Sequence, residues 1–486
     1  MSRLLDPSAF EGKLWNGGWQ PAGGGVLEVD EPATGRLLAR VGRADAADVD
    51  RAVRTARRAQ PAWAATPATE RAAVLRRAAQ LLEQHTDEVA GWLIRESGST
   101  RGKAQFEVGS VLDELWTAAG LPTQPQGSLL QPIGARQSLA RRIPLGVVGV
   151  ISPWNVPMLL GLRAVAPALA LGNAVLLKPD AQTPVSGGFL AARLFQEAGL
   201  PDGILQVLPG DAEAGAALAA HRGVDMIAFT GSTAVGREVG AVAGRDLKRV
   251  SLELGGNNAL IVLDDADLDA ASSAGAFASF FHQGQVCMAT SRHIVLASVA
   301  EAYVDRLVKR AEQLQIGDPH TADVDLGPLI NRTQLARVER IVKESVRLGA
   351  RVRCGGTHED LFFRPTVLSE VTAAMPAFQE EIFGPVAPVI VVADEDEAVR
   401  VANDTDYGLV AAVQTGSAQR GLALADRLQT AIVHVNDQTI NDDAWVPFGG
   451  RGASGNGSRY GAEHSLDEFT QWQWITVAPQ AGQFPF

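Results

Sequence analysis

The first third of the chain changes from an alternating pattern to a helical one. Residues 14–42 alternate apolar and polar positions between Gly and Pro, which predicts hairpin strands. Residues 44–63 follow an Asp start signal and place apolar residues at helical spacing, and 70–97 continue this pattern. Residues 121–142 are rich in Pro and Gln and predict a linker or a protruding hairpin.

From residue 143 the pattern becomes a strand–helix alternation. Short Val/Ile/Leu runs (PLGVVGVISPW, GNAVLLKPD, GILQVLPG and VDMIAFTGS) are each followed by an Ala-rich helical stretch, at 157–171, 184–199, 211–221 and 233–243. Continuous apolar strands alternating with helices predict a parallel sheet that is covered on both faces. Residues 260–440 continue in the same style, so the chain is predicted to form two α/β lobes, and no short-period repeat is visible.

Composition narrows the class of protein. The 486 residues are 20% charged and 46% hydrophobic, as expected for two or three globular domains. A net charge of -12 argues against nucleic-acid binding, although it leaves room for a local basic pocket. The N-terminal residues have no apolar run typical of a secretory signal, and no stretch approaches a membrane span. Two cysteines in so large a chain are expected to be free thiols in a reducing cytoplasm.

One of these cysteines, Cys287, lies in FFHQGQVCMATSR, residues 280–292. Taken alone, it is better explained as a buried small hydrophobe, because free cysteine is among the most buried residue types. The neighbouring Gly284 and Gln285 indicate a turn, however, where a thiol would be available as a nucleophile. The other cysteine, Cys354, lies in a strand-like segment and is predicted to pack.

Two polar residues follow predicted strands in a way that suggests chemistry. Glu253 in SLELGGNN lies between leucines, where an unpaired carboxylate is costly to bury. It is either a solvated strand end or a general base with a raised pKa. Asn155 in ISPWNVP precedes a helix, so it is a candidate N-cap, a candidate oxyanion donor, or both.

Two further strand ends suggest an anion and ribose site. The strand of IAFTGSTAVGREVG runs into Gly231 and Ser232 before a helix, and a helix N-terminus with small residues is suited to a phosphate. Lys178 ends the strand of LLKPD, where it either bonds a ribose hydroxyl or is a solvated surface lysine. The scattered histidines show no metal-ligand spacing, so no metal site is predicted.

Together, ISPWNVP, KPDAQTP, FTGSTAVG, LELGGNN, GQVC, EEIFGPV and PFGGRGASG resemble the aldehyde dehydrogenase superfamily over essentially the whole chain. HQGQVCMA, HVNDQTIN and SGNGSRYG resemble the bacterial benzaldehyde dehydrogenases, and more loosely the vanillin and salicylaldehyde dehydrogenases. This resemblance implies a Rossmann-like cofactor domain, an α/β catalytic domain and a β oligomerisation arm.

The resemblance also implies a role for each candidate. Cys287 would attack the aldehyde, Asn155 and the Cys287 amide would form the oxyanion hole, and Glu253 would activate the water that hydrolyses the thioester. The implied cofactor is NAD, with NADP possible. The residues that would bind it are Ile151, Ser152, Pro153, Trp154, Lys178, Asp180, Gly210, Phe229, Thr230, Gly231, Ser232, Val235, Gly236, Leu254, Gly255, Glu381 and Phe383.

The sequence departs from the family pattern at two places. Ala181 stands three residues after Lys178, where many NAD-using members have a glutamate on the ribose 2′-hydroxyl, so NADP use stays open. Tyr460 stands near the position at which many members carry a second carboxylate for proton relay, so Glu253 is expected to work alone.

The substrate is expected to be an aromatic aldehyde. The residues near the aldehyde tunnel of the family are mostly apolar, and Arg163 is the only obvious basic residue among them: Val156, Leu159, Arg163, Phe281, Val286, Met288 and Trp445. An aliphatic or semialdehyde substrate is the first alternative. A CoA-acylating relative is disfavoured by Glu253, and a non-catalytic cofactor-binding protein by the presence of Cys287, Glu253 and Asn155 together.

The resemblance divides the chain into three parts. Residues 1–120, 143–253 and 448–465 would form the cofactor-binding domain, 254–447 the catalytic domain, and 121–142 with 466–486 the arm. Alternating apolar residues in the tail suit an intersubunit strand, or an ordinary edge strand. A homodimer or homotetramer is therefore expected.

Overall fold

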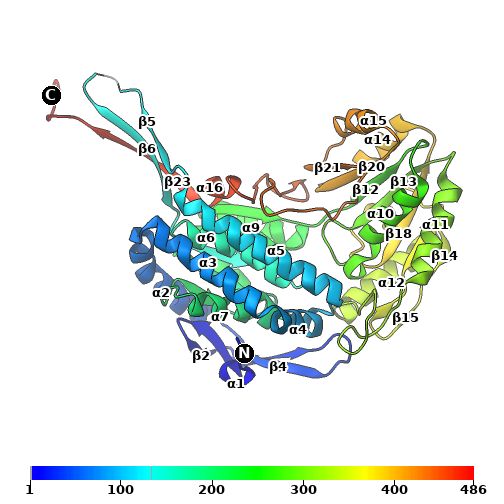
Figure 1. Cartoon of the computed structure of the whole chain (residues 1–486), viewed down its shortest axis with the longest axis horizontal. Coiled ribbons are helices and arrows are strands. Elements are labelled where there is room, and N and C mark those ends of the chain that lie inside the picture. Colours follow the sequence, from blue (N-terminus) through cyan, green and yellow to red (C-terminus); the bar gives the residue numbers. More distant parts are fainter. Residues whose placement is uncertain (1–2, 133) are drawn as a thin grey trace.

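The structure is a computed structural model that describes residues 3–132 and 134–486. It has two α/β lobes and a narrow β arm that projects away from both (Figure 1). The arm carries the C-terminus near its tip, whereas the N-terminus lies at the opposite end of the first lobe.

The first lobe contains a seven-stranded sheet in the order β11-β10-β7-β8-β9-β1-β2 among the described residues. Its parallel part consists of β7 (Val147–Ile151), β8 (Ala174–Lys178), β9 (Leu205–Val207), β10 (Met226–Thr230) and β11 (Arg249–Glu253). The antiparallel strands β1 (Lys13–Asn16) and β2 (Trp19–Pro21) extend it, and a separate hairpin is formed by β3 (Val26–Asp30) and β4 (Leu37–Gly42). The buried runs of β7 and β8 confirm the prediction of a parallel sheet covered on both faces.

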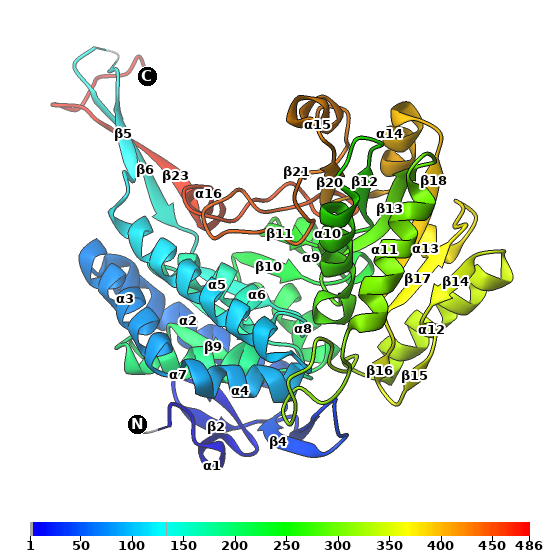
Figure 2. The same ribbon diagram turned by 45° about the vertical axis from the view of Figure 1, so that its right-hand side comes forward.

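Helices cover this sheet and line its edges (Figure 2). They are α1 (Pro7–Phe10), α2 (Ala46–Ala65), α3 (Ala68–Gln84), α4 (Thr86–Ser97), α5 (Arg101–Gly120), α6 (Pro157–Ala170), α7 (Leu190–Glu197), α8 (Ala212–Ala220) and α9 (Thr233–Arg245). The prediction of one helix over 184–199 differs from the structure, because Val185–Phe189 form a π-helical turn before α7. The first two residues of that turn donate their N–H groups to the buried carboxylate of Glu96, which replaces part of the usual helical bonding.

The second lobe contains another seven-stranded sheet, in the order β14-β17-β18-β13-β12-β20-β21. Its strands are β12 (Asn258–Val262), β13 (Thr290–Leu296), β14 (Arg351–Cys354), β17 (Thr366–Ser369), β18 (Val386–Val392), β20 (Val410–Gln414) and β21 (Ile432–Val435). The helices around it are α10 (Leu268–Phe280), α11 (Ala300–Gln313), α12 (Arg332–Arg347), α13 (Pro376–Gln379), α14 (Glu395–Asn403) and α15 (Ala418–Ala425). Short pairs β15 (His358–Glu359) with β16 (Phe362–Phe363), and β19 (Tyr407–Gly408) with β22 (Arg451–Gly452), complete the lobe.

The arm is a three-stranded antiparallel sheet in the order β23-β6-β5. It joins β5 (Gly127–Leu130) and β6 (Gln137–Pro144), from the region predicted to be an excursion, to β23 (Thr470–Val477). The tail is not extended throughout, since α16 (His464–Phe469) precedes β23. Trp472 and Trp474 of β23 are exposed, and Trp474 is 71% accessible. No described helix combines the length and apolar character needed to cross a membrane.

The two lobes meet in a way that prepares a site. The chain leaves β7 toward β8 and β9 on one side and returns to β10 on the other, so the carboxyl ends of β7 and β10 enclose a switch point of the first sheet. Ligands of open α/β sheets bind at such points. In the second lobe, Cys287 lies in the loop before β13 and lines a cavity together with residues of the first lobe. The segment between β21 and α16 runs back from the second lobe to the first (Figure 1).

Candidate active site

Four predicted site residues lie at or just beyond the carboxyl ends of neighbouring strands. Asn155 follows β7, Lys178 ends β8, Gly231 follows β10 and Glu253 ends β11. The strand register places Lys178 opposite Ile151, and Glu253 opposite Thr230. Because parallel strands end at a common edge, residues that are far apart in the sequence are brought to one crevice.

The Cys287 loop is held in a tightly specified conformation. His282, Gln283 and Gly284 all have positive φ angles, of 49°, 57° and 68°. Two consecutive non-glycine residues in this region are uncommon and persist where the surroundings enforce them. A Cβ atom at Gly284 would lie 2.2 Å from the Gly384 carbonyl oxygen, so no larger residue fits there. The loop therefore presents Cys287 from a strained, closely packed turn.

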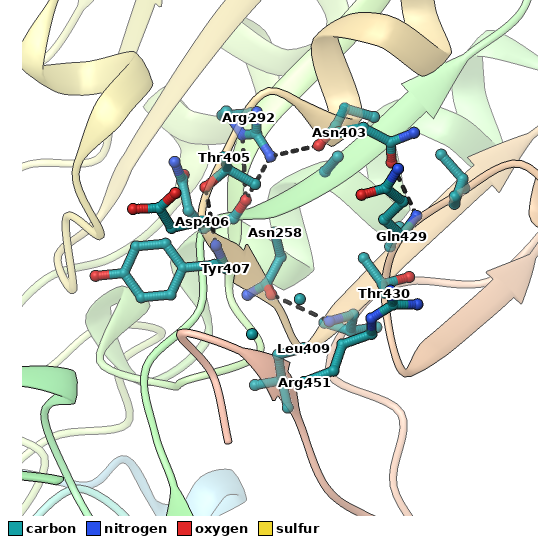
Figure 3. A pocket seen from close by; sticks show the side chains of 18 residues that line it. Asn258, Arg292, Asn403, Thr405, Asp406, Tyr407, Leu409, Gln429, Thr430 and Arg451 are labelled. Atoms are coloured by element: carbon teal, nitrogen blue, oxygen red, sulfur yellow. Dashed lines mark hydrogen bonds between the residues drawn. The ribbon is translucent and has the colours of Figure 1, made fainter. Parts of the chain in front are cut away.

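Asn258 fixes the other side of the Cys287 loop. Its Nδ2 donates to the carbonyl oxygens of Cys287 and Ala289, each at 2.8 Å. A register shift between Asn258 and Ala259 directs this side chain to the loop at the start of β12. Asn258 also lines a cavity of about 120 Å³ behind the loop, together with Arg292 (Figure 3). The guanidinium of Arg292 donates to backbone carbonyls of Asn257, Val401 and Ala402, so its contacts there are structural.

Cys287, Glu253 and Asn155 line one cavity of about 180 Å³ between the lobes. The structure thus brings together the three residues that the sequence motifs proposed as nucleophile, base and oxyanion donor. Glu253 is buried, so the alternative of a solvated strand end is wrong. Neither of its carboxylate oxygens has a side-chain partner or any other assigned hydrogen bond among the described residues.

Asn155 does not cap the helix that follows it. The N-cap of α6 is Val156, which makes no side-chain capping bond, so the N-cap interpretation of Asn155 is wrong. Instead, Asn155 Nδ2 donates to the Gln285 carbonyl oxygen at 2.9 Å. An amide nitrogen carries two hydrogens, so a second donor remains for a substrate oxygen.

Burial and negative charge dominate the electrostatics of this cavity. Burial, with the carboxylates of Glu381 and Glu253, raises the pKa of the Cys287 thiol to about 12. Burial likewise raises the pKa of Glu253 well above its usual value, against the opposing effect of Arg459 and Arg163. The pKa of Glu381 is raised to about 7, again mainly by burial. At neutral pH the Cys287 side chain is therefore favoured as the thiol, and Glu253 holds its proton to higher pH than an exposed glutamate does.

Glu381 and Phe383 lie in the same cavity and are held by backbone contacts. Glu381 Oε1 accepts from the Gly256 amide at 2.9 Å, and a Cβ at Gly255 would lie 2.3 Å from the Glu381 carboxylate. Phe383 has a positive φ of 56°, and its ring meets that of Trp154 edge-on at a centroid distance of 5.4 Å. Gly255 therefore leaves the space that Glu381 occupies.

A second cavity, of about 620 Å³, opens along the carboxyl edge of the first sheet. Most predicted cofactor-binding residues line one or both of the two cavities: Ile151, Ser152, Pro153, Trp154, Lys178, Asp180, Phe229, Thr230, Gly231, Ser232, Val235, Leu254, Gly255, Glu381 and Phe383. Gly210 and Gly236 are not among the lining residues. A Cβ would contact Ala214 at Gly210 and Leu254 at Gly236, so these glycines serve close packing beside the cleft.

The larger cavity fits an elongated nucleotide. The N-terminus of the 13-residue α9 follows Gly231, and Ser232 caps it by accepting from the Val235 amide, so the first-turn amides face the strand end. A Cβ at Gly231 would lie 2.6 Å from the Phe229 ring, which explains the glycine. Lys178 also lines this cavity and is largely buried, so the alternative of a solvated surface lysine is wrong. Burial lowers the pKa of Lys178, whereas the carboxylates of Asp180 and Asp211 oppose this effect.

Sequence patterns missed several residues of both cavities. In the larger cavity these are Asp211, the N-cap of α8, with Gly215 and Ala216 of α8 and Glu238 and Val239 of α9. In the smaller cavity, Gln334 and Arg337 were also missed. Both lie on α12, and their side chains donate to the carbonyl oxygens of Phe383 and Glu381, so they fix the segment that carries these two residues.

The predicted substrate-lining residues are dispersed. Val286 and Met288 pack with Phe448 in an apolar cluster. The partly buried side chains of Cys287 and Phe281 pack against this cluster. Phe281 also stacks on Phe277 in a groove between α5, α10 and residues 323–326. Leu159 is in the core of the first lobe and Val156 packs against it, whereas Trp445 is 56% accessible. None of the seven lines the 180 Å³ cavity.

Arg163 is not available as a free cation. Its Nε donates to Glu114 at 2.8 Å, its Nη2 donates to Asp442 at 2.5 Å, and its guanidinium carbon lies 4.6 Å from the centre of the Phe448 ring. Both partners lie far from it in the sequence, and all three charged groups are buried. Two charge-assisted hydrogen bonds therefore already occupy this guanidinium.

Tyr460 packs against the far side of Glu253. It lines a small void together with Glu253, Arg163 and Phe448, and burial raises its pKa far above the usual tyrosine value.

Among the described residues, no group of three or more metal-ligating side chains is found. The chemistry that this arrangement supports is acyl transfer through a thiol, because the cavity that holds Cys287 is also lined by Asn155 and by the buried carboxylate of Glu253.

Comparison with known proteins agrees with this geometry. The model of the "Aldehyde dehydrogenase family" matches residues 19–475. A vanillin dehydrogenase of Amycolatopsis sp. is 52% identical over 99% of this chain and its own full length. A benzaldehyde dehydrogenase [NAD(+)] of Pseudomonas putida is 50% identical over the whole of both chains.

Solved structures show the same fold. An E. coli NADP dependent enzyme, 34% identical, superposes with a TM-score of 0.94 over 98% of this chain and all of its own. The betaine aldehyde dehydrogenase of Staphylococcus aureus in complex with NAD+, 29% identical, covers 97% of this chain and 96% of its own with a TM-score of 0.93. Because the family model matches residues 19–475 and a relative over its full length is 52% identical, this chain belongs to the aldehyde dehydrogenase family.

Proposed function

We propose that this aldehyde dehydrogenase oxidises aromatic aldehydes to carboxylic acids, with NAD as the preferred cofactor. The observation that carries the proposal is the single buried cavity lined by Cys287, Asn155 and Glu253, next to a cleft that fits a dinucleotide. The relatives named above support the aromatic substrate, since they include a vanillin and a benzaldehyde dehydrogenase.

The first covalent step belongs to Cys287. Its thiolate sulfur forms a bond to the aldehyde carbon, and the carbonyl electron pair moves to oxygen, where the free N–H of Asn155 and the Cys287 amide stabilise it. The thiol must lose its proton first, which its raised pKa makes costly in the absence of a bound cofactor. Cofactor binding and the loss of charge on Glu381 would both favour the thiolate.

When bound, a nicotinamide supplies the acceptor for the hydride that leaves the former aldehyde carbon. Glu381 and Phe383 are the residues that would hold the nicotinamide end, while Lys178, Gly231 and Ser232 would hold the ribose and pyrophosphate. Trp154 lines both cavities and would separate the two ends of the cofactor.

The last step belongs to Glu253. Its carboxylate takes a proton from water, the water oxygen bonds to the thioester carbon, and the Cys287 sulfur leaves to give the acid. A raised pKa brings a carboxylate closer to the pKa of an effective base at neutral pH. The presence of this buried base favours hydrolysis over transfer of the acyl group to CoA, and it also argues against a non-catalytic cofactor-binding protein.

The charge around the thiol favours a neutral, apolar substrate. Arg163, the residue that could have received an acidic aldehyde, is already paired with Glu114 and Asp442. Val286, Met288, Phe281 and Phe448 surround Cys287 with apolar side chains. A semialdehyde carboxylate would therefore find Arg163 already paired and would meet the carboxylates of Glu253 and Glu381 in the cavity that holds Cys287.

The ribose end of the cleft favours NAD over NADP. Ala181 removes the expected glutamate, but Asp180, Asp211 and Glu238 all line the same cavity. A 2′-phosphate adds negative charge, and these carboxylates would repel it, whereas an uncharged hydroxyl can donate to one of them. Lys178 is the one cation that lines this cleft in the described part of the chain.

The division into domains and the subunit contacts are also part of the proposal. Residues 1–120, 143–253 and 448–465 would act as the cofactor domain, 254–447 as the catalytic domain, and 121–142 with 466–486 as the arm. The exposed Trp472 and Trp474 of β23, at the edge of the arm sheet, support pairing of subunits in a homodimer or homotetramer. The free thiols of Cys287 and Cys354 suit a reducing cytoplasm.

A substrate panel tests the proposal. Purified protein is assayed for reduced nicotinamide at 340 nm with benzaldehyde, vanillin, hexanal and succinic semialdehyde, each with NAD and with NADP. We expect kcat/KM to be highest for the aromatic aldehydes with NAD. Equal or better turnover of succinic semialdehyde would reject the aromatic assignment, and equal use of NADP would reject the cofactor preference.

A further inference from the structure

A buried ion pair lies directly behind the oxyanion donor and has no place in the steps above. Lys103 and Glu107 are one turn apart on α5, and their side chains are 1% and 0% accessible. Lys103 Nζ donates to Glu107 Oε2 and, at 2.9 Å, to the Asn155 carbonyl oxygen. The ammonium therefore contacts the backbone of Asn155, the residue proposed as the oxyanion donor.

Glu107 supplies the helix cap that α6 lacks in its own sequence. Val156, at the N-cap, makes no capping bond, and the first helical residue is Pro157. Glu107 Oε1 instead accepts from the amides of Met158 at 2.8 Å and Leu159 at 3.2 Å. A carboxylate from α5 thus fixes where α6 begins, and with it the direction in which the chain leaves Asn155.

The same contacts continue to the Cys287 loop. Asn155 Nδ2 donates to the carbonyl oxygen of Gln285, two residues before Cys287, and Gln285 Oε1 accepts from the Ile330 amide at 3.0 Å. His282, on the same loop, is buried, and its pKa is lowered by burial and by the charge of Lys103. One ammonium therefore lies between the segment that carries the oxyanion donor and the loop that carries the nucleophile.

Stability alone does not account for a charged pair at this position. Apolar residues of similar volume in place of a buried ion pair are often neutral or stabilising. The pair does have a specific geometric consequence: it satisfies the Asn155 carbonyl oxygen, which lies between the end of β7 at Ile151 and the start of α6 at Pro157. An oxyanion donor is effective only when it is held within a fraction of an ångström of its working position.

We propose that Lys103 is a positioning residue for the oxyanion hole, acting through the Asn155 backbone while Glu107 holds both Lys103 and the start of α6. The inference rests on the proposed function only in assigning Asn155 as the oxyanion donor. Loss of Lys103 is expected to lower kcat roughly 10- to 100-fold, as is typical for a misplaced catalytic group, with a smaller change in the KM for aldehyde.

A double-mutant cycle separates this role from a general loss of stability. Lys103→Met, Asn155→Ala and the double variant are compared with the unmodified enzyme, using kcat at saturating NAD with the best aldehyde from the substrate panel. If Lys103 acts through Asn155, Lys103→Met lowers kcat in the unmodified enzyme but has almost no further effect once Asn155 is alanine. Equal fold-losses in both backgrounds would overturn the proposal.

Two further variants keep the test decisive. Glu107→Gln retains an oxygen for the α6 amides but removes the carboxylate from Lys103, and it is expected to show the same non-additivity with Asn155→Ala if Lys103→Met does not fold. Asp48→Asn is the matched control, because Asp48 is also a buried carboxylate that accepts backbone amides, from Gly23 and Asp45, but lies on α2 and lines neither cavity of the cleft. It is expected to lower the melting temperature while kcat stays unchanged.

The control also separates the two levels of inference. If Asp48→Asn lowers kcat as much as Lys103→Met at equal loss of melting temperature, the positioning role is rejected and the enzyme is simply sensitive to destabilisation. If the enzyme prefers an aliphatic aldehyde, the aromatic assignment fails, yet the cycle is still measured with that aldehyde and its outcome still decides the role of Lys103.

Discussion

The two cavities of the cleft share one sheet edge but are built in different ways. The larger one, about 620 Å³, is lined by strand ends and by the small residues of α8 and α9, with carboxylates and Lys178 among them. The smaller one, about 180 Å³, has Cys287, Glu253 and Glu381 in its lining, and burial raises the pKa of all three. The first is suited to recognising a ligand by shape, and the second to moving protons and electron pairs.

This difference follows from where the residues come from. The larger cavity is formed by consecutive strand–helix units of one lobe, so its lining is set by local chain geometry. The smaller cavity joins both lobes, with Glu253 from β11, Cys287 from the loop before β13, and Glu381 from the segment held by α12. Low dielectric and close approach of acidic groups arise only when these distant segments meet. Variants in the two cavities should therefore separate binding from chemistry.

The largest effect is expected at Cys287. Cys287→Ala removes the atom to which the aldehyde carbon bonds, so kcat should fall by roughly 10⁴-fold or more, the order expected when a covalent nucleophile is lost. Binding of NAD, measured by calorimetry or fluorescence titration, should stay close to that of the unmodified protein because the larger cavity is unaltered. Activity surviving in the variant would return Cys287 to a packing role.

A smaller loss, with a changed pH dependence, is expected at Glu253. The raised pKa of Glu253 means that its protonated form, which cannot accept a proton, persists to higher pH than for an ordinary carboxyl. The rate of thioester hydrolysis should therefore rise with pH as Glu253 ionises. Glu253→Gln should lower kcat by about 10²- to 10⁴-fold and abolish that rise, while leaving a burst of reduced cofactor in the first turnover. An unchanged pH profile of kcat in this variant would contradict the role of base.

The smallest effect is expected in the larger cavity. Ala216 of α8 lines it, and Ala216→Leu adds three carbon atoms where the nucleotide is expected to lie. The KM for NAD should rise by roughly 10-fold, which corresponds to about 1.4 kcal/mol of lost binding, with kcat at saturating NAD nearly preserved. Ala217→Leu, on the same helix but outside the lining, serves as the control. A large fall in kcat with an unchanged KM for NAD would contradict the assignment of cofactor binding to the larger cavity and of chemistry to the smaller one.

Much of the fold and of the candidate site was predictable from sequence. The strand–helix alternation after residue 143 predicted β7 to β10 and the helices between them, because a short continuous apolar run and a helical spacing are both local properties of the chain. The motifs around Cys287, Glu253 and Asn155 identified three residues that the structure brings to one cavity. Gly231 and Ser232 were also recognisable, because a strand–turn–helix junction is read within a few residues.

Other features could not be predicted because they depend on long-range contacts. Arg163 was the one obvious basic residue expected near the aldehyde, but Glu114 and Asp442, 49 and 279 residues away, pair with it. Asn155 was a reasonable N-cap by position, yet Glu107 caps α6 from another helix and releases Asn155 to bond the Cys287 loop. The order of apolar and polar residues is enough to select the elements and their layering, because burial of one face is a local requirement of each helix or strand. Which charge meets which, and hence which groups are free to react, is decided by tertiary packing, because a buried charge is stabilised or perturbed only by the groups that surround it in space.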